Sequence, residues 1–572
     1  MQVAAVRHHW PAFVLATAVG LVLVSGPLVA KVRSGVAFGH PLNIRIDDEF
    51  FYFARIREVL DGHPMIGNPY LAEHKAKPPA PVFLGELLAA QPQRWLGGNV
   101  VAWGVFYDFL FPALITLLTY ACLFLVTRLR WLSSISTAFL LLGWSPSTFA
   151  RAVSPQLNFL FWLTLFLLTL LLATRPADSR RKRLLVGLAA LNFGLLFYLY
   201  TYYWTFWLAA LAILAVLFLL SGEREKSMAF ASVAGGGLIL ALPYAFLMLR
   251  AVRLPEYAET LRRIGMIESH FPSGLAIVFP AVGLLAMGAL LLWRRAILLD
   301  AVTLFLAAGI LAAVVSVNQH VVTGKNLEFS SHYLMLSVFW FVFSGAWLVA
   351  KVWAAAGRRR WLWAAAVSIA PAASVLLTFT NAPVWVRPPS EKLLALERYR
   401  PVLAALTAEV KRDDVVWTPG PLASLIPIYT PANVYYENAS RLSFLSDEEV
   451  LDRFAIAHYF TATDDAFVRE RLRGVFGVYD INRVAHARRE NQARSLLGLA
   501  PKPVEPATEK QVSLVLTRLA EARGNDFERE LKKYRADYIV WDRASLPSAP
   551  FDGLPWLDPV AAVDEFRIYR VR

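Results

Sequence analysis

Cysteine is almost absent from this sequence, since Cys122 is the only one among 572 residues. No disulfide can form within the chain, so any exported part must fold without one. The sequence also lacks the glycine-rich Walker A loop of P-loop NTPases, which leaves ATP-driven transport without support. It contains no group of cysteines and histidines with the spacing of a structural zinc site.

Charged residues are scarce as well. They make up 17% of the chain against 57% hydrophobic residues, whereas a soluble domain has roughly 25% charged and 45–50% apolar residues. The formal net charge of +14 is distributed unevenly along the chain. Residues 381–572 hold 27 basic and 27 acidic residues, which leaves 30 basic and 16 acidic residues in residues 1–380. The basic residues of that first part lie in short clusters between apolar runs, which indicates membrane topology and not nucleic-acid binding.

Successive apolar runs predict an α-helical polytopic membrane protein with about eleven spans of the length that a bilayer requires. The first run follows Arg7 and exceeds the apolar core of a signal peptide, so we interpret it as an uncleaved helix. The expected spans are residues 10–31, 101–127, 132–149, 156–174, 184–202, 204–221, 228–249, 273–293, 297–317, 333–352 and 361–380.

Basic clusters occur in every second connection between these spans, and the positive-inside rule places such connections in the cytoplasm. The N-terminus is then cytoplasmic, and an odd number of spans puts the C-terminus outside. This pattern predicts a multi-pass protein of a bacterial-type inner membrane. The clusters are Arg128 and Arg130, Arg175 with Arg180 to Arg183, Arg224 and Lys226, Arg294 and Arg295, and Lys351 with Arg358 to Arg360.

The C-terminal third has a different pattern, with short strand-like segments and amphipathic helices. Strands are expected to begin at Val415, Val434, Tyr538 and Phe566. Helical spacing covers residues 447–460, 464–473, 509–522 and 525–534. We therefore expect two domains, a transmembrane domain over residues 1–380 and a soluble extracytoplasmic α/β domain over residues 381–572.

Three consecutive acids, Asp47, Asp48 and Glu49, lie in the first outer connection, residues 32–100. Adjacent carboxylates at a membrane surface attract a cation, and one of them can act as a general base. They can equally form a solvated cluster at the N-terminus of the next helix. Residues 50–62 have helical spacing with an aromatic start, so this helix is expected to lie along the membrane surface and to hold the acids there.

This order of features, an acidic pair, an interfacial helix with an aromatic residue and an arginine, then a glycine and an Asn-Pro turn, resembles the first outer loop of GT-C glycosyltransferases. The resemblance is sharpest over residues 45–75. In that class an acid of this loop acts as catalytic base or holds a divalent metal, and the matching positions are Asp47 and Asp48. The resemblance implies that Asp48 would be the metal ligand if Mg²⁺ or Mn²⁺ is needed. The resemblance also implies that three residues next to this pair bind substrate, namely Glu49, Tyr52 and Arg55.

Breaking a sugar–phosphate bond leaves an anionic phosphate that cationic groups must stabilise. Residues 318–333 supply a lysine and a histidine before a span whose N-terminal amides attract phosphate, although an ordinary polar turn has the same composition. Asp108 lies inside a span, where an acid marks a functional site or bonds a neighbouring helix. Further candidates that bind substrate are Glu73, His74, Lys75, Asp108, Arg151, Lys325, His332 and Tyr333.

The resemblance predicts inverting transfer of a hexosyl or pentosyl group at the outer face of the membrane. The donor would be a polyprenyl-phosphate sugar and the acceptor a lipid, a glycan or a protein, with membrane lipids as the other partners and no nucleic acid. Residues 381–572 lack the Trp-Trp-Asp signature of oligosaccharyltransferases, so the resemblance is to the class and not to that enzyme. Two alternatives remain, a transporter or flippase for a lipid-linked sugar and a non-catalytic assembly protein.

Overall fold

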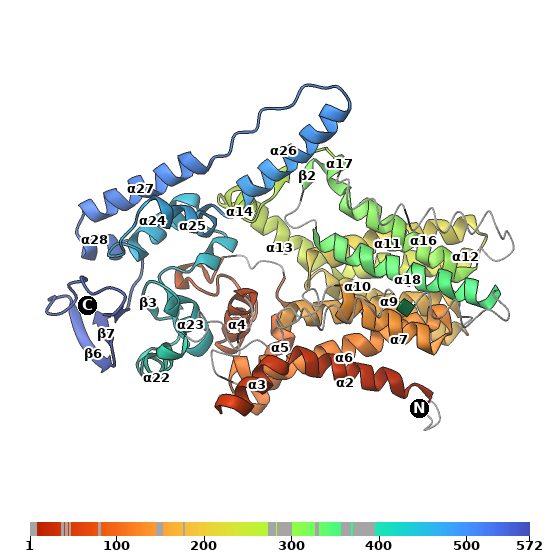
Figure 1. Cartoon of the computed structure of the whole chain (residues 1–572), viewed down its shortest axis with the longest axis horizontal. Helices are drawn as coiled ribbons and strands as arrows, with labels where there is room; N and C mark the ends of the chain where they lie inside the picture. Colours follow the sequence, from red (N-terminus) through yellow and green to blue (C-terminus); the bar gives the residue numbers. More distant parts are fainter. Residues whose placement is uncertain are drawn as a thin grey trace.

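The computed structural model describes residues 8–35, 39, 44, 47–77, 82–144, 153–175, 178–272, 282, 300–326, 331–355, 368–369 and 395–572. These residues form an elongated molecule with a helical bundle at one end and a mixed α/β domain at the other (Figure 1). The expected boundary at residue 380 lies outside the described residues. The division into a helical part and an α/β part nevertheless follows the change of pattern in the sequence.

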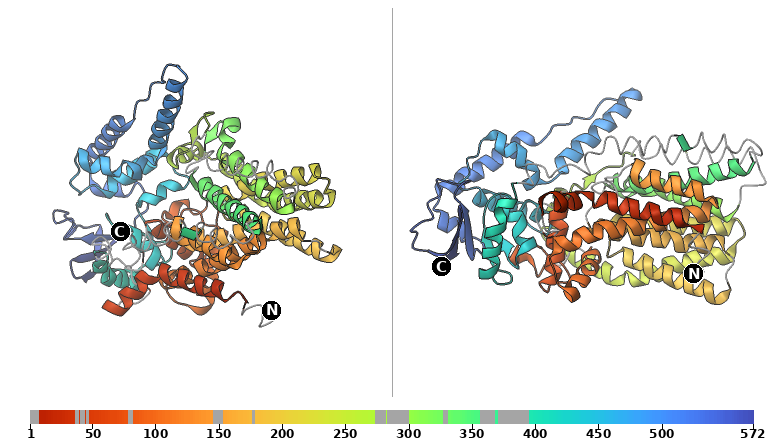
Figure 2. Two further views of the ribbon diagram at one scale, coloured as in Figure 1. Left: turned by 45° about the vertical axis from the view of Figure 1, so that its right-hand side comes forward. Right: turned by 60° about the horizontal axis from the view of Figure 1, so that its bottom comes forward.

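The bundle is built from long apolar helices that run along the length of the molecule (Figure 2). A π-helical segment, η3 (Phe139–Trp144), continues one of them. The described helices of the bundle are α2 (Trp10–Leu23), α3 (Ser25–Ser34), α6 (Val100–Thr127), α7 (Arg130–Ala138), α9 (Val153–Thr174), α10 (Ser179–Leu196), α11 (Thr201–Leu220), α12 (Arg224–Leu240), α13 (Leu242–Val252), α16 (Ala301–Val317) and α18 (Ser331–Ala355).

Four of these helices, α6, α9, α11 and α18, are long and apolar enough to cross a membrane, and the pair α12–α13 would make a fifth. This makes the chain a multi-pass membrane protein, but eleven spans are not confirmed. Two expected spans, residues 273–293 and 361–380, lie almost wholly outside the described residues. The span expected at 228–249 is broken, because α12 and α13 meet at a 50° bend beside Pro243, where the ring removes a backbone donor.

Small residues allow the helices of the bundle to approach closely, as is usual in membrane proteins. Gly309 of α16 lies against the ring of Trp340 of α18, and a Cβ atom there would collide with that ring. Gly20 of α2 meets Phe109 of α6 in the same way. Trp340 is fully buried together with Trp162 and Trp207, so an aromatic core fills the bundle.

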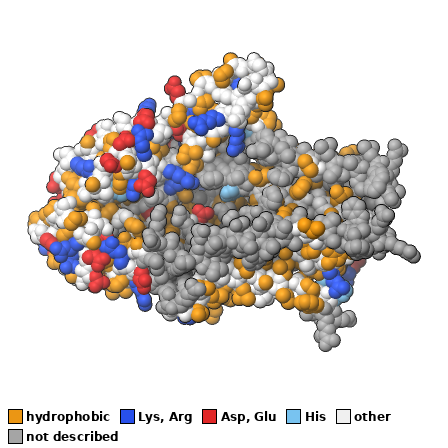
Figure 3. Space-filling model, in the orientation of Figure 1, with side chains coloured by type: hydrophobic (Ala, Val, Ile, Leu, Met, Phe, Trp, Pro, Cys, Tyr) orange, Lys and Arg blue, Asp and Glu red, His pale blue; other side chains and the backbone are white. Residues whose placement is uncertain are grey.

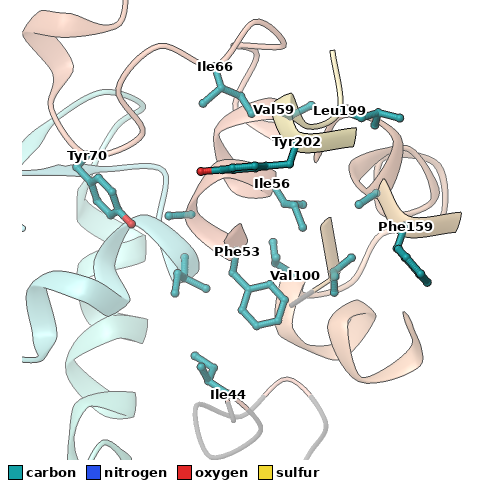
Figure 4. Packing of buried hydrophobic residues seen from close by; sticks show 14 of the residues in the cluster. Ile44, Phe53, Ile56, Val59, Ile66, Tyr70, Val100, Phe159, Leu199 and Tyr202 are labelled. Carbon is teal, nitrogen blue, oxygen red and sulfur yellow. The ribbon is translucent and has the colours of Figure 1, made fainter. Parts of the chain in front are cut away.

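The first outer loop contains α4 (Asp47–Leu60), a short 3₁₀ turn η2 (Ala72–His74) and α5 (Leu84–Leu96). The helix predicted over residues 50–62 is confirmed as α4, although it begins three residues earlier. Its position along the membrane surface stays a prediction. Gly62 follows its end with a φ of 102°, a conformation that side chains disfavour. Apolar residues of α4 pack between the bundle and the α/β domain, as the neighbouring positions of Phe53, Ile56, Tyr70 and Tyr202 show (Figure 4).

The α/β domain contains a five-stranded sheet in the order β4-β3-β5-β7-β6. Strand β3 (Val415–Trp417) pairs in parallel with β4 (Asn433–Val434) and β5 (Tyr538–Asp542). Strands β7 (Phe566–Val571) and β6 (Leu557–Val563) continue the sheet in antiparallel order. The strands predicted at Val415, Tyr538 and Phe566 are confirmed, whereas the strand predicted at Val434 ends at that residue, and β6 was not predicted.

Helices flank this sheet and reach back over the first outer loop. The helices predicted at 447–460, 464–473, 509–522 and 525–534 are confirmed as α24 (Asp447–Ala457), α25 (Asp465–Phe476), α27 (Thr508–Gly524) and α28 (Phe527–Leu531). The helices that were not predicted are α22 (Arg400–Glu409), α23 (Leu422–Tyr429) and α26 (Tyr479–Leu496).

Candidate active site

The predicted acids lie in the first turn of α4. Asp48 is exposed, whereas Glu49 is 1% exposed and points into the protein. The side chain of Asp47 lies outside the described residues. A helix N-terminus favours acids through its dipole, so the first turn accounts for this cluster without any ligand. The structure does not test their catalytic role.

A close contact between α4 and α6 fixes the position of these acids. Phe53, one turn after Glu49, lies on Gly104 of α6, where an added Cβ would be 2.5 Å from the ring. Asp108, one turn further along α6, is buried and accepts a hydrogen bond of 3.2 Å from the side-chain nitrogen of Gln156 on α9. Asp108 therefore bonds a neighbouring helix through an amide, and its role in binding substrate stays a prediction. Two buried acids, Glu49 and Asp108, each lie one turn from the same contact.

Arg55, expected to bind substrate, is buried in an ion pair. Its Nε donates to Oε1 of Glu86 on α5 at 3.0 Å, and its guanidinium lies over the ring of Phe51. Arg55 thus fastens α4 to α5. Tyr52, half-buried, has its ring edge-on to Phe51, and neither residue lines a cavity that the structure describes.

The consecutive residues Glu73, His74 and Lys75 all face the α/β domain. Nε2 of His74 lies 2.8 Å from Oε1 of Glu449, and Oε1 of Glu73 lies 3.1 Å from Nη2 of Arg453. Arg453 is 1% exposed, and its Nε also donates to Glu449 at 2.8 Å. Although burial opposes it, the bonds from His74 and Arg453 lower the pKa of Glu449 to about 2. These side chains connect the first outer loop to helix α24.

Lys75 forms a second ionic group between the same two parts. Its Nζ lies 2.5 Å from Oε2 of Glu58 and 3.1 Å from Oδ1 of Asp413. His63 lies 3.3 Å from Asp413 as well. Burial raises the pKa of the Glu58 carboxyl, whereas Lys75 and His63 lower that of Asp413 against the effect of burial. Lys75 therefore links the first outer loop to the α/β domain, and its role in binding substrate stays a prediction.

A cavity of about 250 Å³ lies where the first outer loop, the end of the bundle and the α/β domain meet. Its apolar wall includes Tyr244 and Met248 of the bent helix α13. The polar side chains that line it are Asn68, His74, Lys77, Thr201, Tyr257, Thr260 and Ser443.

Two buried nitrogen atoms in the polar wall have no hydrogen-bond partner among the described residues. They are Nδ2 of Asn68 and Nδ1 of His74. Oδ1 of Asn68 accepts from the backbone nitrogens of Tyr70 and Leu71, so the amide is oriented with its donor free. Buried donors without a partner are costly, and a ligand with acceptor oxygens would satisfy Asn68.

Lys77 brings positive charge to this wall. Its Nζ donates to Oε1 of Glu256 and to the backbone oxygen of Phe444, both at 2.9 Å. Burial opposes ionisation of Glu256, but the bond from Lys77 lowers the pKa of this carboxyl. The ammonium group is thus held in place by two acceptors from two different segments.

The N-terminus of α11 connects this cavity to the residues predicted to bind phosphate. Thr201, the first residue of α11, lines the cavity, and the preceding Tyr200 is hydrogen-bonded through its hydroxyl to Nδ1 of His332. Tyr333 bonds Thr205, one turn further along α11, at 2.6 Å. His332 and Tyr333 therefore lie next to the helix end that faces the cavity.

Lys325 lies close by in sequence but is exposed. It is in strand β2 (Lys325–Asn326), directly opposite Glu268 of β1 (Ile267–Glu268), which follows the cavity residue Met266. Arg151 lies outside the described residues. Arg263, at the end of the short helix after α13, is buried and bonded to Asp447 of the α/β domain.

A divalent cation would need more ligands than the described acids provide. Within the described ranges, no three side chains of His, Cys, Asp or Glu are grouped as metal ligands. Asp48 and the neighbouring Asp47 would have to supply the coordination together with residues outside those ranges. The assignment of Asp48 as a metal ligand stays a prediction.

The structure therefore divides the predicted residues into separate groups. His74 lines the cavity, and His332 bonds Tyr200, the residue before the lining residue Thr201, whereas Asp48 and Glu49 do not line the cavity. Asp48 is in the first turn of α4 and the cavity begins at Gly67, beyond its last turn. Sequence reasoning missed Asn68, Lys77 and Thr201, although the Asn-Pro turn was part of the motif that pointed to this loop.

No protein-family model and no curated protein sequence matches the chain. Among solved structures, it is similar to the oligosaccharyltransferase AglB of Archaeoglobus fulgidus bound to an inhibitory peptide and a dolichol-phosphate, with 12% identity over 94% of this chain and 70% of that one and a TM-score of 0.44. A second oligosaccharyltransferase structure from the same organism, in the apo form, has 12% identity, coverage of 98% and 88%, and a TM-score of 0.42.

TM-scores below 0.5 establish neither a common fold nor a common activity. The function argued next rests on the residues of this chain.

Proposed function

We propose that this protein is a GT-C-type glycosyltransferase that takes a sugar from a polyprenyl-phosphate donor at the outer face of the membrane. The observation that carries the proposal is the set of donors in the cavity: the free amide nitrogen of Asn68, the ammonium of Lys77 and the Thr201 end of α11. Helix N-termini and ammonium groups both favour phosphate. The apolar wall from α13 would accept the adjoining part of the isoprenoid chain.

In this proposal the acceptor hydroxyl attacks the anomeric carbon and the polyprenyl phosphate leaves with the electron pair of the broken bond. Asp47 or Asp48 would take the hydroxyl proton as a general base. Lys77 and His332 would stabilise the negative charge on the departing phosphate. Attack opposite to the leaving group inverts the configuration at the sugar. Asp48 lines no part of the cavity, so the acceptor would approach from the first turn of α4.

The bent pair α12–α13 is the one observation that favours a transporter, because carriers often use broken helices around their substrate site. Such sites lie near the middle of the membrane. Here α13 contributes its side chains to a cavity shared with the α/β domain, at the end of the bundle. This placement favours an enzyme that acts at the membrane surface.

The test is transfer by the purified full-length protein from a panel of polyprenyl-phosphate sugars. Asp47→Asn and Asp48→Asn should include at least one variant whose turnover falls by about 10²–10⁴-fold, as expected for loss of a general base. Asp61→Asn, just beyond the other end of α4, is the matched control, since the side chain of Asp61 pairs with Arg57 and lines no cavity that the structure describes. Transfer at the normal rate by both Asp47 and Asp48 variants would refute the base assignment.

The cavity is tested separately by Asn68→Asp. This change keeps the oxygen that accepts from Tyr70 and Leu71 and replaces the free donor by an acidic oxygen. It should raise the KM for the donor while leaving the KM for the acceptor unchanged. If the donor KM is unaffected, the cavity does not hold the phosphate.

A further inference from the structure

A second cavity lies at the opposite end of the bundle, away from the α/β domain. It has a volume of about 360 Å³ and is formed by the N-terminal part of α2, the C-terminal part of α6 and the residue that follows α9. Most of its wall is apolar, with Phe13, Leu117, Ala121 and Phe124 among the lining residues. Its size falls in the range of about 300–1,000 Å³ that is usual for small-molecule sites.

Basic groups stand at one end of this apolar cavity. Arg128 and Arg175 line it and are exposed, and neither has an acidic partner among the described residues. His9 also lines it, with Nδ1 2.8 Å from the hydroxyl of Tyr120. In the space-filling view, basic and histidine side chains gather among hydrophobic ones near the N-terminal end of α2 (Figure 3).

The backbone places both arginines at helix ends. Arg128 follows α6 with a φ of 59° and its N–H bonds Phe124 at 2.9 Å, while Arg175 follows α9. Each arginine stabilises the C-terminal end of its helix. Asp178 is the acid nearest in sequence, and its side chain is used to cap α10. The cavity therefore keeps a net positive end.

We propose that this cavity binds one anionic phospholipid, with the headgroup phosphate at Arg128 and Arg175 and an acyl chain along α2 and α6. The cavity opens among helices of a membrane bundle, where lipid is the abundant apolar molecule, and basic pockets of this kind bind anionic headgroups. The topology predicted from the basic clusters assigns this end of the bundle to the cytoplasmic leaflet. This inference is independent of the proposed glycosyl transfer, because no residue of this cavity takes part in it.

The experiment measures lipid binding by native mass spectrometry of the full-length protein, titrated in neutral detergent with phosphatidylglycerol or phosphatidylcholine. One molecule of phosphatidylglycerol should bind, and phosphatidylcholine should bind more weakly. Arg128→Gln with Arg175→Gln should weaken the binding of phosphatidylglycerol about thirty-fold, the loss expected for two basic side chains near an anionic group. Ala121→Trp fills the apolar part of the cavity without a change of charge and should abolish the binding of phosphatidylglycerol.

The matched control is Arg180→Gln with Arg183→Gln, which removes two exposed charges of the same cytoplasmic cluster that do not line the cavity. It should bind phosphatidylglycerol as the unchanged protein does. Equal losses in both double variants would overturn the proposal in favour of general surface attraction. Equal binding of phosphatidylcholine, normal binding by Ala121→Trp, or displacement of the lipid by millimolar inorganic phosphate would overturn it as well.

Discussion

The imidazole of His74 lies 2.8 Å from the carboxylate of Glu449, across 375 positions of the sequence. This pair connects the first outer loop to the α/β domain, and His74 also lines the cavity between them. A change in how the domain sits on the bundle would therefore move a residue of the candidate site. The α/β domain is a structural part of that site and not an appended module.

Glu449→Gln should destabilise the junction, and the effect should depend on pH. The pKa of Glu449 is lowered to about 2 in the folded protein, so its contribution is complete above about pH 4.5 and is lost as the pH falls towards 2. At neutral pH the loss should be about 1–3 kcal/mol, since glutamine keeps one acceptor oxygen but removes the negative charge that pairs with the buried Arg453. The difference in thermal unfolding temperature between the two proteins should shrink below pH 4.5.

Glu448→Gln is the matched control for this prediction. Glu448 is the exposed neighbour in the same first turn of α24. Its replacement should leave the unfolding temperature nearly unchanged. If the Glu449 and Glu448 variants lose the same stability at every pH, the contacts of Glu449 with His74 and Arg453 do not stabilise the junction.

Lys75→Met should be more damaging alone than in combination with Glu58→Gln. Removing the lysine leaves a buried carboxylate uncompensated, which costs about 3–5 kcal/mol. The pKa of Glu58 is already raised by burial, so the folded state holds this proton more tightly than the unfolded state. The single variant should therefore lose stability as the pH rises above about 4.5, and Glu58→Gln should restore most of it. A double variant as unstable as the single one would contradict this account.

Local features of this fold follow from the sequence because they depend on neighbouring residues. The helix after Asp48 and the strand at Val415 are set by periodicity and turn residues over short windows. Glu73, His74 and Lys75 were expected at the substrate because an ionisable run next to a membrane is a usual site of function. Their partners Glu449 and Arg453 lie far along the chain, and no spacing rule predicts such pairs.

The cavity and the broken span were not predicted for the same reason, because both depend on packing between segments that are far apart in the sequence. Pro243 lies inside an apolar run of normal length, and composition alone does not distinguish a bend from a tolerated proline. Asn68 was seen as a turn residue, which it is, but its free amide donor depends on how the loop packs beneath residues 442–444. The chemistry of this loop was suggested by the sequence, whereas the position of the cavity was not.

Reporter fusions will test the predicted topology. The alternating basic clusters place Arg183 in the cytoplasm and Ser390 outside. A phosphatase reporter, which is active only outside, should therefore be active after Ser390 and inactive after Arg183. Similar activity at both positions would contradict an outer α/β domain, and with it a site that uses donors from the outer leaflet.

The last prediction compares two lysines for the role of phosphate ligand. Lys77 lines the cavity and is held by Glu256 and Phe444, whereas Lys325 is exposed on a short strand opposite Glu268. An ammonium group that is partly shielded from water acts more strongly on a phosphate than an exposed one, because salt and water screen it less. Lys77→Met should therefore raise the KM for the donor by about tenfold or more, the effect of roughly 1.4 kcal/mol.

Lys325→Met should raise the donor KM by less, and neither change should alter the KM for the acceptor. The measurement is the initial rate against donor concentration at fixed acceptor, followed by the reverse series. A larger effect from Lys325 would indicate that the phosphate binds at the β1–β2 hairpin, as the sequence alone suggested. An effect of either variant on the acceptor alone would mean that this side of the junction binds the acceptor, and the donor would then have to enter beside α4, where Asp48 lies.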